Sequence, residues 1–423
     1  MEQWYKLDNT AKLFPAVSKR KNSSVFRASA VLNAPINPVA LQQAVNHIYD
    51  RFPMLFTRLH NGVFWNYMEE RANIFLVKED TDYPCAKINF KENNGYMLRV
   101  LYFGSRISAE FFHTLTDGNG AFEFLKSLIF YYLRFNGEYF KDEGKVITAE
   151  TRFGSEETSD GYQKYFSAPS QSSNLPKERE KSAYRISGTL FLEYGNNLTT
   201  GTMSASALNA LAKRHNASIT SYLAAVMVHS ILQNRNLKDR RPIVLTVPVN
   251  LRRQFPINSL RNFFCVVNLS YAQNQSCDFD DIVKSMTTQL KEKTTKENLQ
   301  RIVAKNLAFE QSALIRWVPL FIKRMFMIFG FDLMGERKKT ITLTNTGRLT
   351  LPEGMKKYIN RFELTSYPTP RSPMFAAVCT FDDTLTLTFG RAISETDIIR
   401  SFFMFLSNAG GLQIEMSSND WGL

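Results

Sequence analysis

Residues 107–137 read ISAEFFHTLTDGNGAFEFLKSLIFYYLRFNG. Alternate residues up to His113 are apolar, and this period of two predicts a β-strand whose more apolar, inward face ends at His113. The next residues, 116–120, form a dense turn signal, TDGNG. From Ala121 onward apolar side chains recur at helical spacing, and Gly137 marks the end of the helix. The stretch therefore predicts a strand with a histidine at its tip, a tight turn and a buried helix.

This arrangement suits a histidine that transfers protons. An imidazole titrates near neutral pH, so His113 can take a proton from a hydroxyl group and later return it to a leaving group. Asp117 falls in the turn, where a carboxylate is better placed to orient the backbone than to react, and Gly118 permits a close approach of chains or positive φ. The same string also fits a turn beside a histidine that is merely packed. A metal site is not expected, because HxxxD spans a turn and no third ligand is evident.

The flanking segments predict an alternation of strands and helices. The expected elements of the first half are a strand at 24–32, a helix from Asn37-Pro38 to about Tyr49, and a hairpin of 96–103 with 107–113. Those of the second half are helices at 204–213, 218–233 and 278–293, strands at 242–249, 340–345, 375–380 and 385–389, and a helix at 394–407 that starts with a Ser-x-x-Asp capping sequence. Because both halves mix strands and helices, we predict an α/β (α+β) fold.

Length and composition predict two lobes. The chain has 423 residues, which exceeds one ordinary core and suits two lobes of ~200 residues each. The stretch 151–182 is rich in Ser, Gly, Pro and charged residues and shows little periodicity, as is typical of a linker or crossover. We therefore expect an N-terminal lobe at 1–150, this linker, and a C-terminal lobe at 183–423.

The charge balance and the cysteines narrow the class of protein. Lys and Arg number 52 and Asp and Glu 39, a net charge of +13, which is compatible with a phosphate-bearing small ligand, a membrane face or no specific partner. No long basic arm, zinc-finger pattern or RRM motif is present, so no nucleic-acid partner is expected. The cysteines are scattered without a CxxC pair, which favours a reduced cytoplasmic protein without a metal; they are Cys85, Cys265, Cys277 and Cys379.

Two further stretches bear on membranes. The N-terminal residues lack the continuous apolar segment of a signal peptide. The most apolar later stretch, 317–333, is too short and too charged to span a bilayer. The surrounding segment, 314–339, fits a helix packed on the second lobe, or an interfacial helix that admits a hydrophobic acceptor or touches anionic lipid. The expected location is cytoplasmic, with peripheral membrane contact at most.

In its strand–turn–helix context HTLTDG, residues 113–118, resembles the HxxxDG signature of the CoA-dependent acyltransferase superfamily. That superfamily includes chloramphenicol acetyltransferase, plant BAHD acyltransferases, peptide-synthetase condensation domains and microbial alcohol acetyltransferases. Further segments that resemble its members follow in matching order: AVNHIYDRFPMLFTRL at 44–59, VPVNLRRQF at 247–255, LRNFFCVVNL at 260–269 and TNTGRLTLPEG at 344–354. The resemblance extends from about residue 25 to about residue 405.

Some positions depart from particular branches of the superfamily. Phe112 stands where condensation domains carry another histidine, and Phe56 stands where their early motif has an arginine. A DFGWG motif is absent; Asp420-Trp421-Gly422 lies at the extreme C-terminus. The chain therefore looks most like the free-standing microbial alcohol acetyltransferases.

The resemblance implies two chloramphenicol-acetyltransferase-like lobes with a tunnel between them, in which donor and acceptor meet at His113. It implies that His113 is the general base and that Asp117 has a structural role. Gly118 completes the motif, and the resemblance implies that Arg252 pairs with Asp117. Thr344, Asn345 and Thr346 are candidates to stabilise the negative charge that develops on the carbonyl oxygen, because the strand at 340–345 would reach the tunnel.

The function that we expect is transfer of an acyl group, with acetyl favoured, from a CoA thioester to an alcohol hydroxyl. Acyl-CoA is then a co-substrate, and no bound cofactor is expected. Two alternatives stay open: a condensation-like enzyme that uses a carrier-protein thioester or forms an amide, and a relative that binds ligand without catalysis. The acceptor, the acyl chain length and the oligomeric state are not encoded in any motif of the chain.

Overall fold

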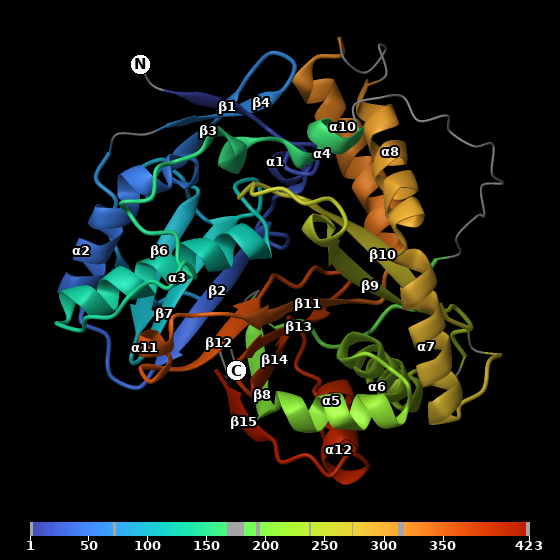
Figure 1. Cartoon of the computed structure of the whole chain (residues 1–423). Helices are drawn as coiled ribbons and strands as arrows, with labels where there is room; N and C mark the ends of the chain where they lie inside the picture. The colour runs from blue at the N-terminus through green and yellow to red at the C-terminus, as the bar shows by residue number, and fades with distance from the viewer. Residues whose placement is uncertain are drawn as a thin grey trace.

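The computed structural model describes residues 3–70, 73–166, 182–191, 195–236, 238–272, 274–311 and 317–419 (Figure 1). These residues form a five-stranded, a seven-stranded and a three-stranded sheet, with helices packed around them. The predicted α/β class is confirmed.

The five-stranded sheet has the order β12-β2-β7-β6-β5, and its centre is the hairpin of β6 and β7. Helices α2 and α3 pack against each other, and α3 also contacts β2 and β7 (Figure 1). Asn37 caps α2 by accepting from the N–H of Val39 and Ala40, and Pro38 fills its first position, as predicted. The elements are β2 (Val25–Leu32), α2 (Pro38–Ile48), β5 (Lys78–Glu79), β6 (Leu98–Phe103), β7 (Arg106–Phe112), α3 (Gly118–Phe135) and β12 (Ile359–Thr365).

The seven-stranded sheet has the order β10-β9-β11-β13-β14-β8-β15. β11 runs parallel to β9 and to β13, and the other neighbours are antiparallel. Its strands are β8 (Asn197–Ser204), β9 (Ile243–Asn250), β10 (Phe264–Tyr271), β11 (Ile341–Leu349), β13 (Met374–Phe381), β14 (Thr384–Arg391) and β15 (Glu415–Ser418). The helices of this half are α5 (Ala205–Arg214), α6 (Ile219–Asn234), α7 (Phe279–Lys293), α8 (Lys296–Gln311), α10 (Leu320–Gly330) and α12 (Asp397–Asn408).

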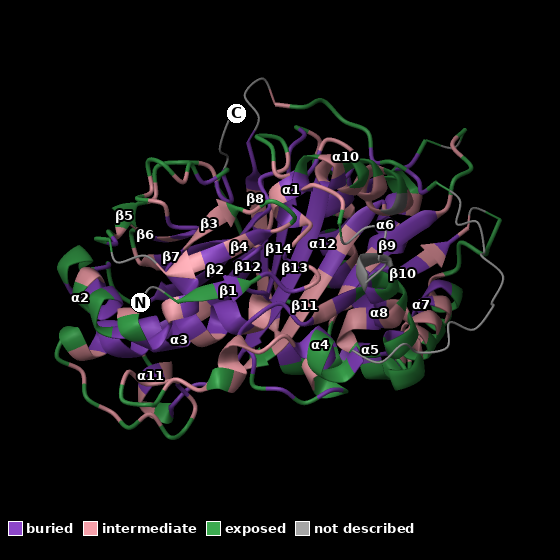
Figure 2. Cartoon of the chain, turned by 90° about the horizontal axis from the view of Figure 1, so that it is seen from above, coloured by how far each residue is buried: buried purple, intermediate pink, exposed green. Residues whose placement is uncertain are grey.

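Smaller elements complete the molecule. A three-stranded sheet has the order β1-β4-β3 and lies near the N-terminus (Figure 1). Its strands and the short helices are β1 (Trp4–Lys6), β3 (Thr57–Asn61), β4 (Asn66–Glu70), α1 (Phe14–Val17), α4 (Gly161–Phe166) and α11 (Glu353–Lys356). Buried residues are concentrated along the central strands and the helices that face them (Figure 2).

β12 joins the two halves of the chain. It pairs antiparallel with β2 of the five-stranded sheet, although it lies within the segment 183–423. It also contacts β13 and β14 of the seven-stranded sheet. The lobe boundaries at 1–150 and 183–423 stay a prediction. β12 crosses them, because it belongs to the second segment by sequence and to the sheet of the first segment by pairing. Of the predicted linker, 151–182, residues 167–181 lie outside the described residues.

Two local predictions were wrong. The last helix starts at Asp397 rather than at Ser394, because the N–H of Ser394 donates to Thr189 O and the carboxylate of Glu395 accepts from Thr189. These contacts hold the residues before the helix in another conformation. The glycines of the predicted turn at 116–120 belong to the first turn of α3, because Asp117 caps the helix there.

None of the helices in the described ranges has both the length and the apolar character needed to cross a bilayer.

We predict that Gly120→Ala destabilises the protein. An added Cβ would lie 2.2 Å from Thr116 Oγ1 and 2.3 Å from Leu260 O, so the first turn of α3 would have to move away from the loop that contains Leu260. Overpacking of this kind costs about 1–3 kcal/mol, which outweighs the helix propensity gained with alanine. Thermal unfolding should show a midpoint several degrees below the wild type. The matched control is Gly154→Ala, whose Cβ would meet only ordinary contacts at 3.7 Å; an equal shift in both variants would contradict the prediction.

Candidate active site

His113 lies directly after β7, in a ring of aromatic side chains. Its imidazole stacks on Phe14 at a centroid distance of 4.4 Å and an interplanar angle of 8°. Phe26 and Phe264 flank the ring at 4.7 and 5.6 Å. The backbone N–H of His113 donates to Ser24 O over 2.8 Å. The three aromatic contacts and this hydrogen bond hold the ring in place, and the residue as a whole is partly exposed.

Asn262 determines which ring nitrogen of His113 carries the proton. The amide nitrogen Nδ2 of Asn262 faces two acceptors, His113 O at 3.0 Å and Asp8 Oδ2 at 3.4 Å. The carbonyl oxygen Oδ1 therefore faces His113 Nδ1, at 3.1 Å. Because Oδ1 can only accept, Nδ1 must donate, and in the neutral ring Nε2 keeps its lone pair.

The surroundings of His113 favour the neutral imidazole. Burial among apolar rings lowers the pKa of His113 below its usual value of 6.5. The charge of Asp117 and the hydrogen bond to Asn262 act in the opposite direction but are smaller effects. At neutral pH the ring can therefore accept a proton at Nε2.

Asp117 uses both carboxylate oxygens to hold the backbone. Oδ1 accepts from the N–H of Asn119 and of Gly120 at 3.1 and 3.3 Å, which caps α3. Oδ2 accepts from Arg252 Nη1 at 2.7 Å and from the N–H of Phe263 at 2.9 Å. A carboxylate that has four donors orients its neighbours and is not available to react.

Arg252, the predicted partner of Asp117, also holds the loop after β9. Its guanidinium donates to Ser259 O through Nε at 3.1 Å and through Nη2 at 2.9 Å, and to Arg261 O. Its backbone N–H donates to Asn250 Oδ1 at 3.0 Å. The side chain thus links the N-terminus of α3 to the loop that leads to Asn262.

β11 brings one of the other predicted residues, Thr346, close to the motif. An added Cβ on Gly118 would lie 3.3 Å from Thr346 Cγ2, so the first turn of α3 lies against this strand. Thr346 Oγ1 donates to Val378 O at 3.2 Å, and Asn345 Nδ2 donates to Thr220 Oγ1 at 3.0 Å. Thr344 is partly exposed on the same strand.

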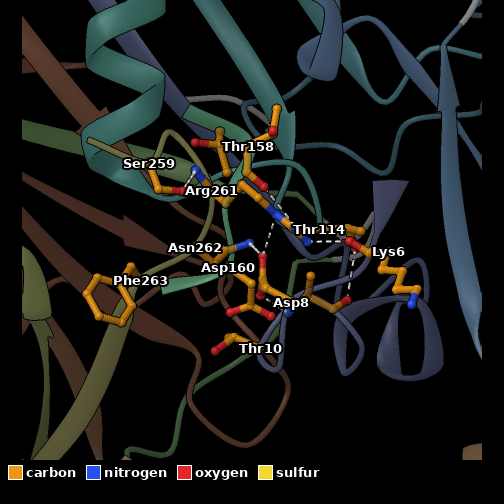
Figure 3. A network of polar contacts seen from close by, with 12 residues as sticks. Lys6, Asp8, Thr10, Thr114, Thr158, Asp160, Ser259, Arg261, Asn262 and Phe263 are labelled. Atoms are coloured by element: carbon orange, nitrogen blue, oxygen red, sulfur yellow. Dashed lines mark hydrogen bonds and ion pairs between the residues drawn. The ribbon is translucent and has the colours of Figure 1, made fainter. Parts of the chain in front are cut away.

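A buried polar network behind Asn262 was not predicted from the sequence. Figure 3 shows Asp8, Arg261 and Asn262 directed toward one another. Asp8 is fully buried, its Oδ1 accepts from the N–H of Ala11 at 2.8 Å, and Arg261 Nε lies 3.7 Å from Oδ2. Burial raises the pKa of Asp8 to about 6, although the charge of Arg261 opposes the shift. The only sequence signal was the segment 260–269, which carried the family resemblance without singling out Asn262.

The predicted tunnel stays a prediction. A cavity of about 220 Å³ lies beside the motif and is lined by residues that include Pro15, Ser23, Lys87, Phe90, Phe112 and Arg324. Phe112 precedes His113, but His113 is not among the residues that line this cavity. Among the described residues, no group of three or more His, Cys, Asp or Glu side chains is placed to hold a metal ion.

No protein-family model and no curated protein matches the sequence. Solved structures do match the fold. TRI3, a trichothecene 15-O-acetyltransferase from Fusarium sporotrichioides, has a TM-score of 0.60 and 11% identity, over 96% of this chain and 94% of that one. TRI101 from F. graminearum, complexed with coenzyme A and deoxynivalenol, has a TM-score of 0.63 and 9% identity, over 97% and 99%. The starter condensation domain of rhizomide synthetase RzmA, whose structure contains C8-CoA, has a TM-score of 0.58 and 13% identity, over 97% and 95%.

These likenesses show the fold over nearly the whole chain. The chain shares the two-lobed fold of TRI3, TRI101 and the RzmA condensation domain, as the sequence resemblance predicted.

We predict that Arg252→Met strongly destabilises the protein. The variant leaves the almost buried carboxylate of Asp117 without its cation, and removal of one partner of such a pair costs about 3–5 kcal/mol. Urea unfolding followed by tryptophan fluorescence measures the loss.

The matched control for Arg252→Met is Arg241→Met. Arg241 pairs with Asp239 at the surface, where an ion pair contributes about 0–1 kcal/mol. If Arg252→Met were no more destabilised than this control, the ion pair would not stabilise the contact between α3 and the loop after β9.

Proposed function

We propose that the protein transfers an acyl group from acyl-CoA to a hydroxyl acceptor, with His113 as the general base. The observation that carries the proposal is the hydrogen bond of His113 Nδ1 to Asn262, which leaves Nε2 as a proton acceptor. The fold supports it, because TRI3 is an O-acetyltransferase and TRI101 was solved with coenzyme A.

The proposed reaction transfers one proton and one acyl group. Nε2 of His113 takes the proton of the acceptor hydroxyl while the hydroxyl oxygen attacks the thioester carbonyl carbon. The carbonyl π electrons move to the oxygen, which becomes negatively charged. When the carbonyl re-forms, the bond to sulfur breaks, and the leaving CoA thiolate receives the proton from the imidazolium. The products are the ester and free CoA, and the histidine returns to its starting state.

We infer that Thr344 donates to the developing oxyanion. Thr346 already uses its only side-chain donor on Val378 O, and Asn345 uses one of its two amide N–H groups on Thr220 Oγ1. Thr344 is partly exposed and lies two residues before Thr346, whose methyl group faces Gly118. A hydroxyl donor at this position would act on the charge that forms in the transition state.

The favoured donor is acetyl-CoA and the favoured acceptor is an alcohol. The net charge of +13 suits the phosphates of CoA, and an acetyl group with an alcohol acceptor follows the example of TRI3. A carrier-protein thioester or an amine acceptor is the second candidate, because the fold is shared with a condensation domain. Parallel assays with acetyl-CoA and with an acetylated phosphopantetheinyl carrier protein separate these donors. Tight acyl-CoA binding without turnover would instead identify a non-catalytic relative.

We propose a cytoplasmic location for this reaction. All four cysteines are free thiols, and Cys85, Cys265 and Cys379 are buried. Burial raises the pKa of Cys265 to about 12. Unreactive free thiols are typical of proteins in a reducing compartment.

We predict that His113→Ala abolishes acceptor-dependent release of CoA thiol. Loss of a general base lowers kcat by about 10²–10⁴-fold, and a thiol reagent measures the release. His47→Ala is the control, because His47 is exposed on α2 and contacts Tyr131 and Phe135 away from His113. Unchanged turnover in His113→Ala would remove His113 from the reaction.

The pH profile provides a second prediction for the wild-type enzyme. Because burial lowers the pKa of His113, the base stays neutral to below pH 6.5. The rate constant kcat/KM should therefore be constant at neutral pH and should fall only as the pH drops through that lowered pKa. A limb centred above pH 7 would contradict this assignment.

We predict that Asn262→Ala lowers kcat by roughly 10-fold or more, because the tautomer and the ring orientation are no longer fixed. The hydrogen bond from Nδ1 raises the pKa of His113, so its loss should also move the acidic limb of the pH profile to lower pH. A residue with only a structural role would lower the melting temperature without moving that limb. An unshifted limb in an active variant would show that Asn262 does not position the base.

A further inference from the structure

Helix α10, Leu320–Gly330, has the reverse of the usual polarity for a helix at the surface. Its sequence is LFIKRMFMIFG, and it lies at the periphery of the molecule (Figure 1, Figure 2). Lys323 is only 3% exposed. The large apolar side chains point outward instead, with 65–71% of their surface exposed: Phe321, Met325, Phe326 and Phe329, together with Trp317 before the helix.

Polar contacts to the β3–β4 loop hold α10 in this orientation. The N–H of Leu320 donates to Val63 O at 2.9 Å, and Lys323 Nζ donates to Phe64 O at 3.1 Å. The ammonium of Lys323 also lies over the Trp65 ring, 3.9 Å from its centroid. Because the cation is fixed on the inner side, rotating the helix to bury its phenylalanines would break these contacts.

The loop extends the apolar surface of the helix. Val63 and Phe64 are exposed, and the ring of Phe64 packs edge-on against Trp317 with 5.8 Å between the ring centroids. Leu333 and Ile328 are also exposed. We call this surface the α10 patch; its residues are Val63, Phe64, Trp317, Phe321, Met325, Phe326, Ile328, Phe329 and Leu333. Such a contiguous apolar surface marks a binding face rather than a solvated one.

Basic residues lie near the patch. Helix α1 packs against α10 and leads into the exposed residues Lys19, Arg20 and Lys21. Arg324 on α10 is partly exposed, and the carboxylate of Asp332, which follows the helix, is neutralised by Arg337 and Arg371. Together with the net charge of +13 on the whole chain, these cations favour an anionic partner at this surface.

We propose that the α10 patch docks the protein on an anionic lipid bilayer. A helix with Trp, Phe, Met and Leu on one face inserts that face into the boundary between headgroups and acyl chains, and nearby cations attract anionic headgroups. The charge argues against a second copy of this chain as the occupant, because two surfaces of the same sign would meet. Docking does not depend on the proposed acyl transfer.

The test is co-sedimentation of the full chain with lipid vesicles. Vesicles of phosphatidylcholine and phosphatidylglycerol in about a 2:1 ratio should bind the protein at least roughly tenfold better than phosphatidylcholine alone. Binding should weaken when salt is raised from about 0.05 M to about 0.5 M, because salt screens the charges. Failure to bind the mixed vesicles at low salt would overturn the proposal.

Variants identify the surface. The triple change Phe321→Ser, Phe326→Ser and Phe329→Ser removes exposed side chains, so the fold should persist, and it should reduce vesicle binding roughly tenfold or more. The matched control changes Val39, Ile74 and Tyr139 to Ser, which are exposed to a similar or greater degree outside the patch. Equal loss in both triple variants would contradict docking through α10. A different result would assign the patch to a second copy of the chain. In that case light scattering shows a dimer of the wild-type protein and a monomer of the triple α10 variant, and the wild-type protein does not bind vesicles.

Discussion

The ion pair between Asp117 and Arg252 determines how the two halves of the candidate site meet. Asp117 begins α3, which packs on the five-stranded sheet, whereas Arg252 follows β9 of the seven-stranded sheet. The pair is almost excluded from water, and the remaining lone pairs of the carboxylate are used by two helix N–H groups and by Phe263. Displacing any one of these groups would leave a buried charge incompletely bonded, and such a group is expensive to bury.

The position of the imidazole follows from this joint. His113 precedes Asp117 by four residues, and Asn262 directly precedes Phe263, whose N–H is bonded to Asp117. Once Asp117 and Phe263 are fixed to each other, His113 and Asn262 are brought side by side, at 3.1 Å. The ion pair of Asp117 and Arg252 takes no part in proton transfer, but it places Asn262 where Asn262 selects the tautomer of His113.

The sequence predicted the local parts of this arrangement well and its long-range parts poorly. The strand, the histidine at its tip and the helix after it depend on residues within 31 positions of one another, so periodicity and capping chemistry were sufficient. β12 depends on pairing with β2 more than 300 residues earlier, for which no local pattern exists. Asn262 was missed because its importance comes from what lies opposite it, and Ser394 was misjudged because a distant segment, at Thr189, holds the residues before the helix.

The buried carboxylate of Asp8 orients Asn262, as Asn262 orients the imidazole of His113. Above a pH of about 6 it is ionised and can only accept, so it holds the Nδ2 group of Asn262 and leaves the carbonyl oxygen for His113 Nδ1. Protonation of Asp8 at lower pH would give it a donor of its own and weaken that preference. Because burial also lowers the pKa of His113, the neutral imidazole and the ionised Asp8 coexist at neutral pH. Burial therefore favours the neutral imidazole, whereas it confines the ionised form of Asp8 to pH values above about 6, and both conditions are met at neutral pH.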